Sequence, residues 1–230
     1  IAGNALLQPS SNITDCVKLL ASDGQANDQF GRSVSLDGDY CIVGAFLEDA
    51  KGSDAGAAYV FRRTGTNTWD AGVKITAPDG VAGAQFGYSV DIDGDYAIVG
   101  APFFTRSGTT GGVAYIFRRT GTNSWTDSFK LEPVINSNDE NFGFSVSISG
   151  DIAIGGIPKE NFGFQTNPGA AFAFIRIGTN TWSSEIRIQA PDDQANDQFG
   201  YSVSIDGDYV IIGAPFEDQI HSDSGAAYIF

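Results

Sequence analysis

The sequence is poor in the residues that carry out most enzyme chemistry. His221 is the only histidine among the 230 residues, and it lies in a segment that has no counterpart in the rest of the chain. Neither a catalytic triad nor a histidine metal cluster can be assembled around it. A glycine-rich phosphate loop with its lysine is absent, and the acidic residues lack an apolar pocket that would suit one to proton transfer. We therefore expect that the protein is not an enzyme.

Basic residues and long apolar runs are also scarce. The chain has 13 Lys and Arg residues against 28 Asp and Glu residues, a formal net charge of -15. Such a charge repels phosphate backbones and anionic membrane surfaces. No segment approaches the ~20 consecutive apolar residues of a membrane-spanning helix. We therefore predict that the protein has no nucleic-acid partner and does not insert into a membrane.

Cysteine and methionine are rare or absent as well. The two cysteines, Cys16 and Cys41, are too few for a disulfide framework. Cys41 occupies a position that holds Ala or Val in the repeats described next, which predicts a small buried side chain. The chain has no methionine and stops at Phe230 within an apolar run. We expect it to be a portion of a longer protein.

Glycine and phenylalanine, by contrast, are abundant, with 29 and 17 residues. This composition favours many tight turns between packed strands. The strongest signal is an internal repeat, which decides the fold before any single motif does. The pair Phe-Gly, followed two residues on by Ser-Val, begins at four positions that are 56, 56 and 57 residues apart: Phe30, Phe86, Phe142 and Phe199.

Each repeat has the same order of predicted strands. A short strand, a turn such as Asp206-Gly207-Asp208 and an apolar run predict a β-hairpin. A loop of variable length leads to a third strand, over residues 56–61, 112–117, 169–174 and 225–230. A turn that ends in tryptophan then leads to a fourth strand, in which a basic residue lies between apolar ones, as an exposed edge requires. Its copies are Val73-Lys74-Ile75, Phe129-Lys130-Leu131 and Ile186-Arg187-Ile188.

These units predict an all-β fold, a four-bladed β-propeller of four-stranded antiparallel blades. The last repeat contains only three of its strands, whereas the N-terminal motif Val17-Lys18-Leu19 is an outer strand without a blade. We therefore predict that residues 16–29 complete the last blade and close the ring. The domain organisation is then an irregular leader over residues 1–15 and a single propeller over residues 16–230.

The repeat resembles the FG-GAP repeats of integrin α-subunit propellers, and more closely the bacterial-type variant found in large surface and secreted proteins. All four repeats carry the Phe-Gly pair, and Gly100-Ala101-Pro102 and Gly213-Ala214-Pro215 match the second half of the signature. The first and third repeats depart from it with Gly44-Ala45-Phe46 and Gly156-Ile157-Pro158. The resemblance implies an extracellular or cell-surface propeller for adhesion, assembly or ligand binding, without catalysis. Integrin propellers have seven blades, and this chain encodes fewer.

Calcium is the one metal that the resemblance suggests, because many family members hold it in an acidic loop between the first two strands. Here that loop is only a tight turn such as Asp37-Gly38-Asp39, which cannot supply ~6–8 oxygen ligands. Better candidates lie in the loop before the third strand of the first and last repeats, namely Glu48, Asp49, Asp54, Glu217, Asp218 and Asp223. The alternative is that these are solvated loop acids.

Two further patterns suggest a role for sugars. Trp69, Trp125 and Trp182 recur at the end of the outer turn, where aromatic rings could stack on sugars; the alternative is that they pack between strands or blades. Asn12-Ile13-Thr14 matches the acceptor pattern for N-glycosylation at Asn12.

We therefore expect a non-catalytic extracellular module for adhesion or assembly, with protein partners that include further copies of itself. In a filament, the strand formed by Val17, Lys18 and Leu19 would complete the last blade of a neighbouring subunit rather than its own. The alternatives are a carbohydrate-binding propeller and a calcium-dependent, integrin-like ligand-binding module.

Overall fold

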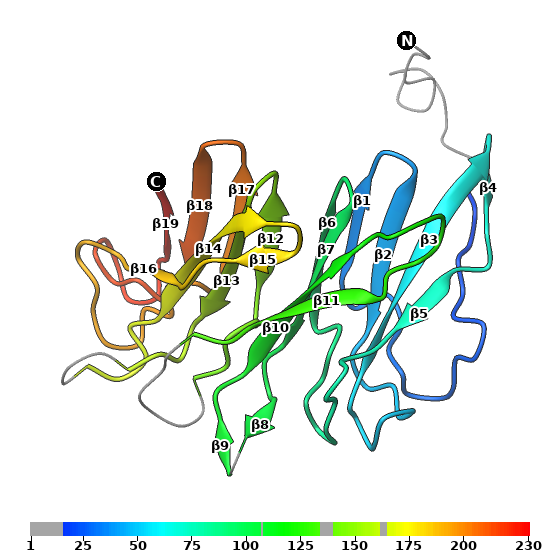
Figure 1. Cartoon of the computed structure of the whole chain (residues 1–230). Helices are drawn as coiled ribbons and strands as arrows, with labels where there is room; N and C mark the ends of the chain where they lie inside the picture. The colour runs from blue at the N-terminus through cyan, green and yellow to red at the C-terminus, as the bar shows by residue number, and fades with distance from the viewer. Residues whose placement is uncertain (1–15, 107, 134–139, 162–164) are drawn as a thin grey trace.

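The computed structural model describes residues 16–106, 108–133, 140–161 and 165–230. Over these ranges the chain is all-β: four antiparallel sheets follow one another in sequence, and one short separate hairpin lies within the second repeat. Figure 1 shows the sheets side by side in an open arc, from the blue and cyan first sheet to the orange and red last one. The prediction of an all-β fold is confirmed.

The first three sheets contain the four strands that each repeat predicts. The first sheet consists of β1 (Val34–Asp37), β2 (Tyr40–Ala45), β3 (Ala57–Gly65) and β5 (Val73–Ile75), with β4 (Thr68–Trp69) paired to the end of β3. The second consists of β6 (Ser89–Asp93), β7 (Tyr96–Ala101), β10 (Val113–Arg118) and β11 (Asp127–Leu131), and its loop carries the hairpin of β8 (Thr105–Arg106) and β9 (Thr109–Thr110). The third consists of β12 (Val146–Ser149), β13 (Ile152–Ile157), β14 (Ala170–Gly178) and β16 (Ile186–Ile188), with β15 (Thr181–Trp182) paired to the end of β14.

The last sheet has three strands in the described part of the chain. They are β17 (Ser202–Asp206), β18 (Tyr209–Ala214) and β19 (Ala226–Ile229). Every sheet opens with the predicted hairpin: Asp37, for example, pairs with Tyr40 across a two-residue turn. The turn glycine Gly38 has a φ of 54°, a left-handed conformation that glycine adopts without a steric penalty.

Successive sheets pack face to face through apolar side chains, and we call each such interface a sheet–sheet junction. One hydrophobic cluster joins the first two sheets, and includes Ile42 from β2 and Val90 from β6. Similar clusters join the second sheet to the third and the third to the last. The first strands of the sheets, β1, β6, β12 and β17, are neighbours in that order along the inner edge of the arc.

Each junction also has the same polar contact at its centre. A serine hydroxyl donates a hydrogen bond to the carbonyl oxygen of the glycine in the next Phe-Gly pair: Ser33 to Gly87 at 2.9 Å, Ser89 to Gly143 at 2.8 Å and Ser145 to Gly200 at 2.9 Å. The backbones come very close here, because a Cβ at Gly44 would lie 2.0 Å from the Gly87 oxygen. Glycine is therefore required at this place.

The structure corrects the prediction that the N-terminal strand closes the ring within its own chain. Val17–Leu19 forms no strand, and within the described residues β19 pairs only with β18. Instead, Leu19 and Ala21 pack on the first sheet, against the cluster that contains Val43 and Tyr59. The physical reason is distance, because the first and last sheets lie at opposite ends of the arc (Figure 1). The leader over residues 1–15 lies outside the described residues.

Candidate functional site

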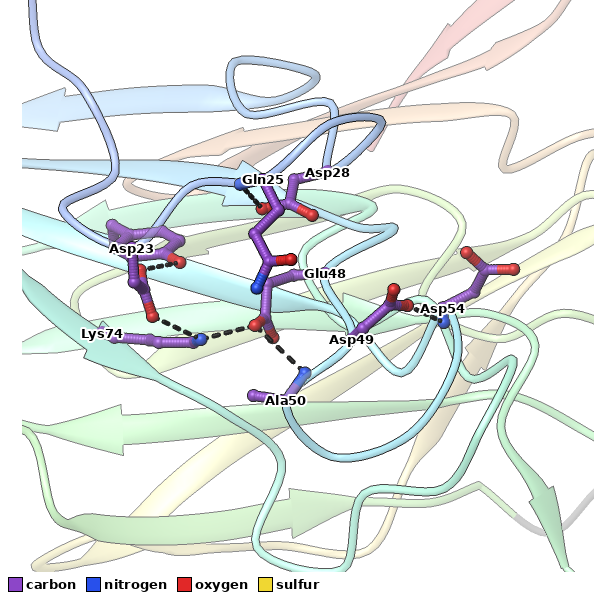
Figure 2. Close-up of polar contacts among 9 residues, drawn as sticks. Asp23, Gln25, Asp28, Glu48, Asp49, Ala50, Asp54 and Lys74 are labelled. Carbon is purple, nitrogen blue, oxygen red and sulfur yellow. Dashed lines mark hydrogen bonds and ion pairs between the residues drawn. The ribbon is translucent and has the colours of Figure 1, made fainter.

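The acidic loop between β2 and β3 places Glu48 inside the protein rather than in solvent. Glu48 is buried, and its Oε1 accepts hydrogen bonds from Ala50 N at 3.0 Å and from Lys74 Nζ at 2.5 Å. Lys74 Nζ also donates to Asp23 Oδ2 at 2.9 Å. Figure 2 shows the lysine between these two carboxylates. A lysine on the outer strand β5 thus neutralises an acid on a loop of the same sheet.

The other two acids of this loop stabilise its backbone. Asp49 Oδ1 accepts a hydrogen bond from Asp54 N at 2.8 Å, and Figure 2 shows both residues on the other side of the loop from Glu48. The loop before β19 repeats the arrangement, since Asp218 accepts from Asp223 N at 2.6 Å and Glu217 accepts from Gln219 N at 2.8 Å. The six predicted metal ligands therefore form two loops of the same design.

Calcium stays a prediction for these loops. In the described part of the chain, no group of three or more Asp, Glu, His or Cys side chains is arranged to hold a metal ion. The tight turn between the first two strands of the first sheet does not suit calcium, because its acids already have partners. Asp37 Oδ2 accepts a hydrogen bond from Gly94 N of the next sheet at 2.9 Å, and Asp39 pairs with Arg63.

Two of the three tryptophans, Trp125 and Trp182, lie at sheet–sheet junctions. Trp125 and Trp182 are buried, at 3% and 4% exposure, which leaves no open ring face on which a sugar could stack. Each packs edge-on against a tyrosine of the preceding sheet: Trp125 on Tyr40 and Trp182 on Tyr96, with ring centroids 5.8 and 6.2 Å apart. Trp69 belongs to the first sheet, which has no preceding sheet, and it is only half-buried. Asn12 lies outside the described residues.

The outer-strand basic residue has a carboxylate partner in each of the first three sheets. Lys74 pairs with Glu48, Lys130 with Asp79 at 3.0 Å, and Arg187 with Glu160 at 2.5 Å. The same register places this residue opposite the central aromatic residue of the third strand. The pairs are Tyr59 with Lys74, Tyr115 with Lys130 and Phe172 with Arg187.

The last sheet has the acids of this arrangement, and no ion pair with a lysine or arginine is found for them among the described residues. Asp197 and Glu217 are 1% and 4% exposed, and Asp192 hydrogen-bonds Tyr228 of β19. We call Asp192, Asp197 and Glu217 the acid pocket. Asp197 Oδ1 has no hydrogen-bond partner within the described structure. Burial and the negative charges of Glu217, Asp218 and Asp192 raise the pKa of Asp197.

Sequence reasoning placed Glu217 among the candidate metal ligands but left Asp197 and its counterpart Asp28 as loop acids of undecided role. Both are buried, and both accept a hydrogen bond from the backbone three residues earlier, Asp28 from Gln25 N and Asp197 from Gln194 N. The repeat contained the signal. Asp28 and Asp197 each lie two residues before the Phe-Gly pair, in loops with the common sequence Gln-Ala-Asn-Asp-Gln.

The two ends of the arc expose apolar faces that the internal junctions bury. On β1, Val34 is 67% exposed, whereas its counterpart Val90 on β6 is 8% exposed. On β18, Tyr209 is 71% exposed, whereas its counterpart Tyr40 on β2 is 9% exposed. Leu36, Ile211 and Ile229 are exposed in the same way. Each end of the arc is therefore one uncovered half of a sheet–sheet junction.

A family model for the FG-GAP repeat matches residues 13–61, 69–117 and 182–230, which is more than half of the chain. The chain belongs to the FG-GAP repeat family. The second and third matched segments begin near the outer strands β5 and β16 and run through the third strand of the next sheet, so these two repeat units each cross a junction. Residues 118–181, which include most of the third sheet, lie outside the matches. This agrees with the departure at Gly156-Ile157-Pro158.

FG-GAP repeat domains in general mediate protein–protein interactions, and this FG-GAP chain is a repeat module of that kind. FG-GAP repeats also occur in extracellular proteins. None of the elements within the described ranges is a helix long and apolar enough to cross a membrane. No curated protein matches the chain.

Proposed function

We propose that this FG-GAP chain is a non-enzymatic, extracellular structural module that assembles with further copies of itself by adding a strand. The N-terminal segment Val17–Leu19 of one copy pairs with the free edge of β19 in the next copy. The last sheet then gains the outer strand that the other three sheets already have. Repetition of this step builds a closed ring of propeller blades or a filament.

One observation carries the proposal: among the residues that the structure describes, an outer-strand motif lies outside any sheet, and the last sheet has no outer strand. The Val17-Lys18-Leu19 segment, in which Val17 and Lys18 are exposed, has the sequence pattern of β5, β11 and β16. Among the described residues, the outer edge of β19 has no partner. An unpaired strand edge is a template on which another strand can add through backbone hydrogen bonds.

The acid pocket gives this strand addition its register. In the first sheet Lys74 lies opposite Tyr59 and pairs with Glu48 and Asp23. The same register places Lys18 opposite Tyr228, where its ammonium group reaches Glu217 and Asp192. A shift by one residue would turn Lys18 to the other face of the sheet and leave the buried acids uncompensated.

The native Cys16 provides a direct test of the strand addition. Gly72 and Phe61 are the counterparts of Cys16 and Phe230, and the β3–β5 register continues to place them opposite each other. A Phe230→Cys substitution therefore brings a second thiol within disulfide distance of Cys16 from another copy. Cys16 is exposed and Cys41 is buried, and burial raises the pKa of the Cys41 thiol to about 11, so Cys41 stays unreactive.

Mild oxidation of the Phe230→Cys protein should give covalent dimers and larger species on non-reducing gels. Two controls isolate the designed bond: Phe230→Ser, which keeps Cys16 alone, and Phe230→Cys combined with Cys16→Ser. Neither control should cross-link beyond the wild type. A covalent bond formed only within one chain would reject exchange between copies. Equal assembly of a variant that lacks residues 1–20 would reject it independently.

Sugar binding and calcium-dependent ligand binding are predictions of the sequence that no observation favours over assembly. The buried Trp125 and Trp182 cannot take part in a repeated sugar site. The loop acids Glu48 and Asp49 already accept hydrogen bonds from lysine or backbone donors.

A further inference from the structure

We propose that Asp91 couples the first sheet to the third, so that a substitution in one of these sheets changes the strength of contacts in the other. Asp91 lies on β6, and β1 and β12 are the neighbours of β6 on its two sides (Figure 1). The carboxylate accepts hydrogen bonds from both of them. This inference goes beyond the proposed assembly and does not depend on it, because every contact lies within one copy of the chain.

Each carboxylate oxygen of Asp91 faces one of the two neighbouring sheets. Oδ1 accepts hydrogen bonds from the hydroxyl of Ser35 on β1 at 2.6 Å and from Ile92 N of its own strand at 2.9 Å. Oδ2 accepts hydrogen bonds from the hydroxyl of Ser147 at 2.7 Å and from Ile148 N at 2.9 Å, both on β12. The two hydroxyl contacts have the short length of charge-assisted hydrogen bonds, which are about twice as strong as neutral ones.

An acid at this position distinguishes the second repeat from the other three. The counterparts of Asp91 are Ser35, Ser147 and Ser204. A serine hydroxyl has one oxygen and donates its own hydrogen, whereas an ionised carboxylate has two oxygens that only accept. A carboxylate between two sheets that each present a serine can therefore accept from both sides at once.

The third junction shows the same contact without an acid. Ser147 meets the last sheet through a longer hydrogen bond, from Ile205 N to its Oγ at 3.3 Å. The same hydroxyl donates to Asp91. A row of hydrogen bonds therefore runs from Ser35 through Asp91 and Ser147 to Ile205 and crosses the four sheets, and Asp91 is its charged member.

The carboxylate transmits a change because its two sets of donors share one side chain. Among the residues that the structure describes, no lysine or arginine forms an ion pair with Asp91. Hydrogen-bond donors therefore hold this half-buried charge in place. The Ser35 hydroxyl fixes the rotamer from which Oδ2 reaches β12. When Ser35 is lost, the bonds from Ser147 and Ile148 weaken, because they alone must then order the side chain.

Asp93, on the same strand, provides a comparison. Its Oδ2 accepts a hydrogen bond from Gly150 N of the third sheet at 2.6 Å. Asp37 makes the same contact at the first junction, with Gly94 N at 2.9 Å. In the described structure each of these two acids links one pair of neighbouring sheets, whereas Asp91 links two pairs.

A double-mutant cycle tests the coupling. Ser35→Ala and Ser147→Ala are made singly and together, and the equilibrium constant of unfolding is measured by urea denaturation. We expect the combined effect on this constant to be about fivefold smaller than the product of the two single effects, because the first substitution has already released the carboxylate. In a chain that also carries Asp91→Ser, the two effects should simply multiply.

Asp93→Ser is the matched control for Asp91→Ser. Both substitutions replace an acid of β6 with the serine that the third repeat has at the same place, Ser149 or Ser147. The fivefold coupling should remain in the Asp93→Ser chain. Effects that simply multiply in the wild-type chain, or a coupling that is also lost in the Asp93→Ser chain, would overturn the proposal.

A second measurement does not require the Asp91→Ser chain to fold. Ser35→Ala should shift the amide proton resonance of Ile148 upfield, because the hydrogen bond from Ile148 N to Asp91 lengthens. Ser33→Ala removes a hydrogen bond at the same junction, to the carbonyl oxygen of Gly87, and should leave that resonance in place. A resonance that responds to both substitutions or to neither would reject the coupling. Neither outcome bears on the proposed assembly, which the cross-linking experiment tests separately.

Discussion

Lys74 and the buried Glu48 form a part-buried ion pair across the first sheet, with 2.5 Å between Nζ and Oε1. The lysine comes from the outer strand β5, and the glutamate comes from the loop that leads to β3. The last sheet has the corresponding glutamate, Glu217, but no outer strand pairs with β19 among the residues that the structure describes. The lysine–glutamate pair is therefore complete in the first sheet, whereas the described part of the last sheet contains only its glutamate.

Removal of the lysine should destabilise the chain. Lys74→Ala leaves Glu48 buried without its cation, and we expect a loss of about 2 to 3 kcal/mol in the free energy of unfolding, measured by urea denaturation. Lys18→Ala is the matched control, because Lys18 occupies the same place in the repeat but is exposed. Its loss should change monomer stability by less than about 0.5 kcal/mol. Equal effects of the two substitutions would contradict the pairing.

Tyr40 and Tyr209 occupy equivalent positions in the repeat, and their replacement should change the free energy of unfolding by different amounts. Tyr40→Ala removes a buried ring that packs on Trp125 and binds Arg119, so we expect a loss of about 3 kcal/mol or more. Tyr209→Ala changes an exposed ring and should alter the unfolding free energy of the monomer by less than about 0.5 kcal/mol. Thermal unfolding of dilute samples measures both. A similar loss in both variants would show that Tyr209 already has a partner.

The acid pocket should make the monomer less stable at neutral pH. The pKa of Asp197 is higher in the folded chain than that of an ordinary aspartate, first because of burial and then because of the negative charges of Glu217, Asp218 and Asp192. A raised folded pKa favours folding below the unfolded pKa, and this contribution is lost as the pH rises through the folded pKa. Asp197→Asn, which stays neutral, should therefore be more stable than the wild type at pH 7.

A comparison at low pH is the control for the Asp197→Asn prediction. Below about pH 3.9 the wild-type carboxyl is protonated in both states, so the two proteins should differ little there. Asp23 should show the opposite sign, since hydrogen bonds from Lys74 and Tyr59 lower its pKa. Asp23→Asn should reduce stability at neutral pH, and the reduction should vanish as the pH falls through the lowered pKa. Urea denaturation at several pH values distinguishes the two signs.

Local features of the sequence predicted local features of the structure. The Asp-Gly turns fixed the hairpins, because a left-handed glycine such as Gly38 specifies a two-residue loop. The 56-residue spacing between Phe30 and Phe86 predicted one sheet per repeat. Contacts between residues of different sheets could not be predicted from the sequence pattern. Tyr40 and Arg119 are 79 residues apart, and only the packing of two sheets shows that they meet.

The predicted ring closure failed for a related reason. The motif Val17-Lys18-Leu19 has the pattern of an outer strand, but the pattern alone does not specify with which sheet, if any, it pairs. That depends on the curvature accumulated over successive junctions, each of which adds a rotation that no single residue determines. Burial of Asp197 was missed because an acid in a polar loop is usually solvated.

The glycines at the sheet–sheet junctions allow a test of how closely neighbouring sheets pack. A Cβ at Gly100 would lie 2.0 Å from the carbonyl oxygen of Gly143 in the next sheet, whereas a Cβ at Gly213 would meet only Ser202 and other atoms of its own sheet. Both would also approach the serine hydroxyl of their own sheet, at 2.3 and 2.5 Å. The difference between Gly100→Ala and Gly213→Ala therefore isolates the contact with a neighbouring sheet.

Gly100→Ala should lower the free energy of unfolding more than Gly213→Ala does, with a difference of about 3 kcal/mol or more. The reason is that a backbone carbonyl cannot move aside without separating two sheets. Gly213→Ala should keep more of the wild-type stability in urea denaturation, because only the hydroxyl of Ser202 has to move aside. An equal loss of stability in the two variants would show that the carbonyl of Gly143 does not decide the cost of the added methyl group.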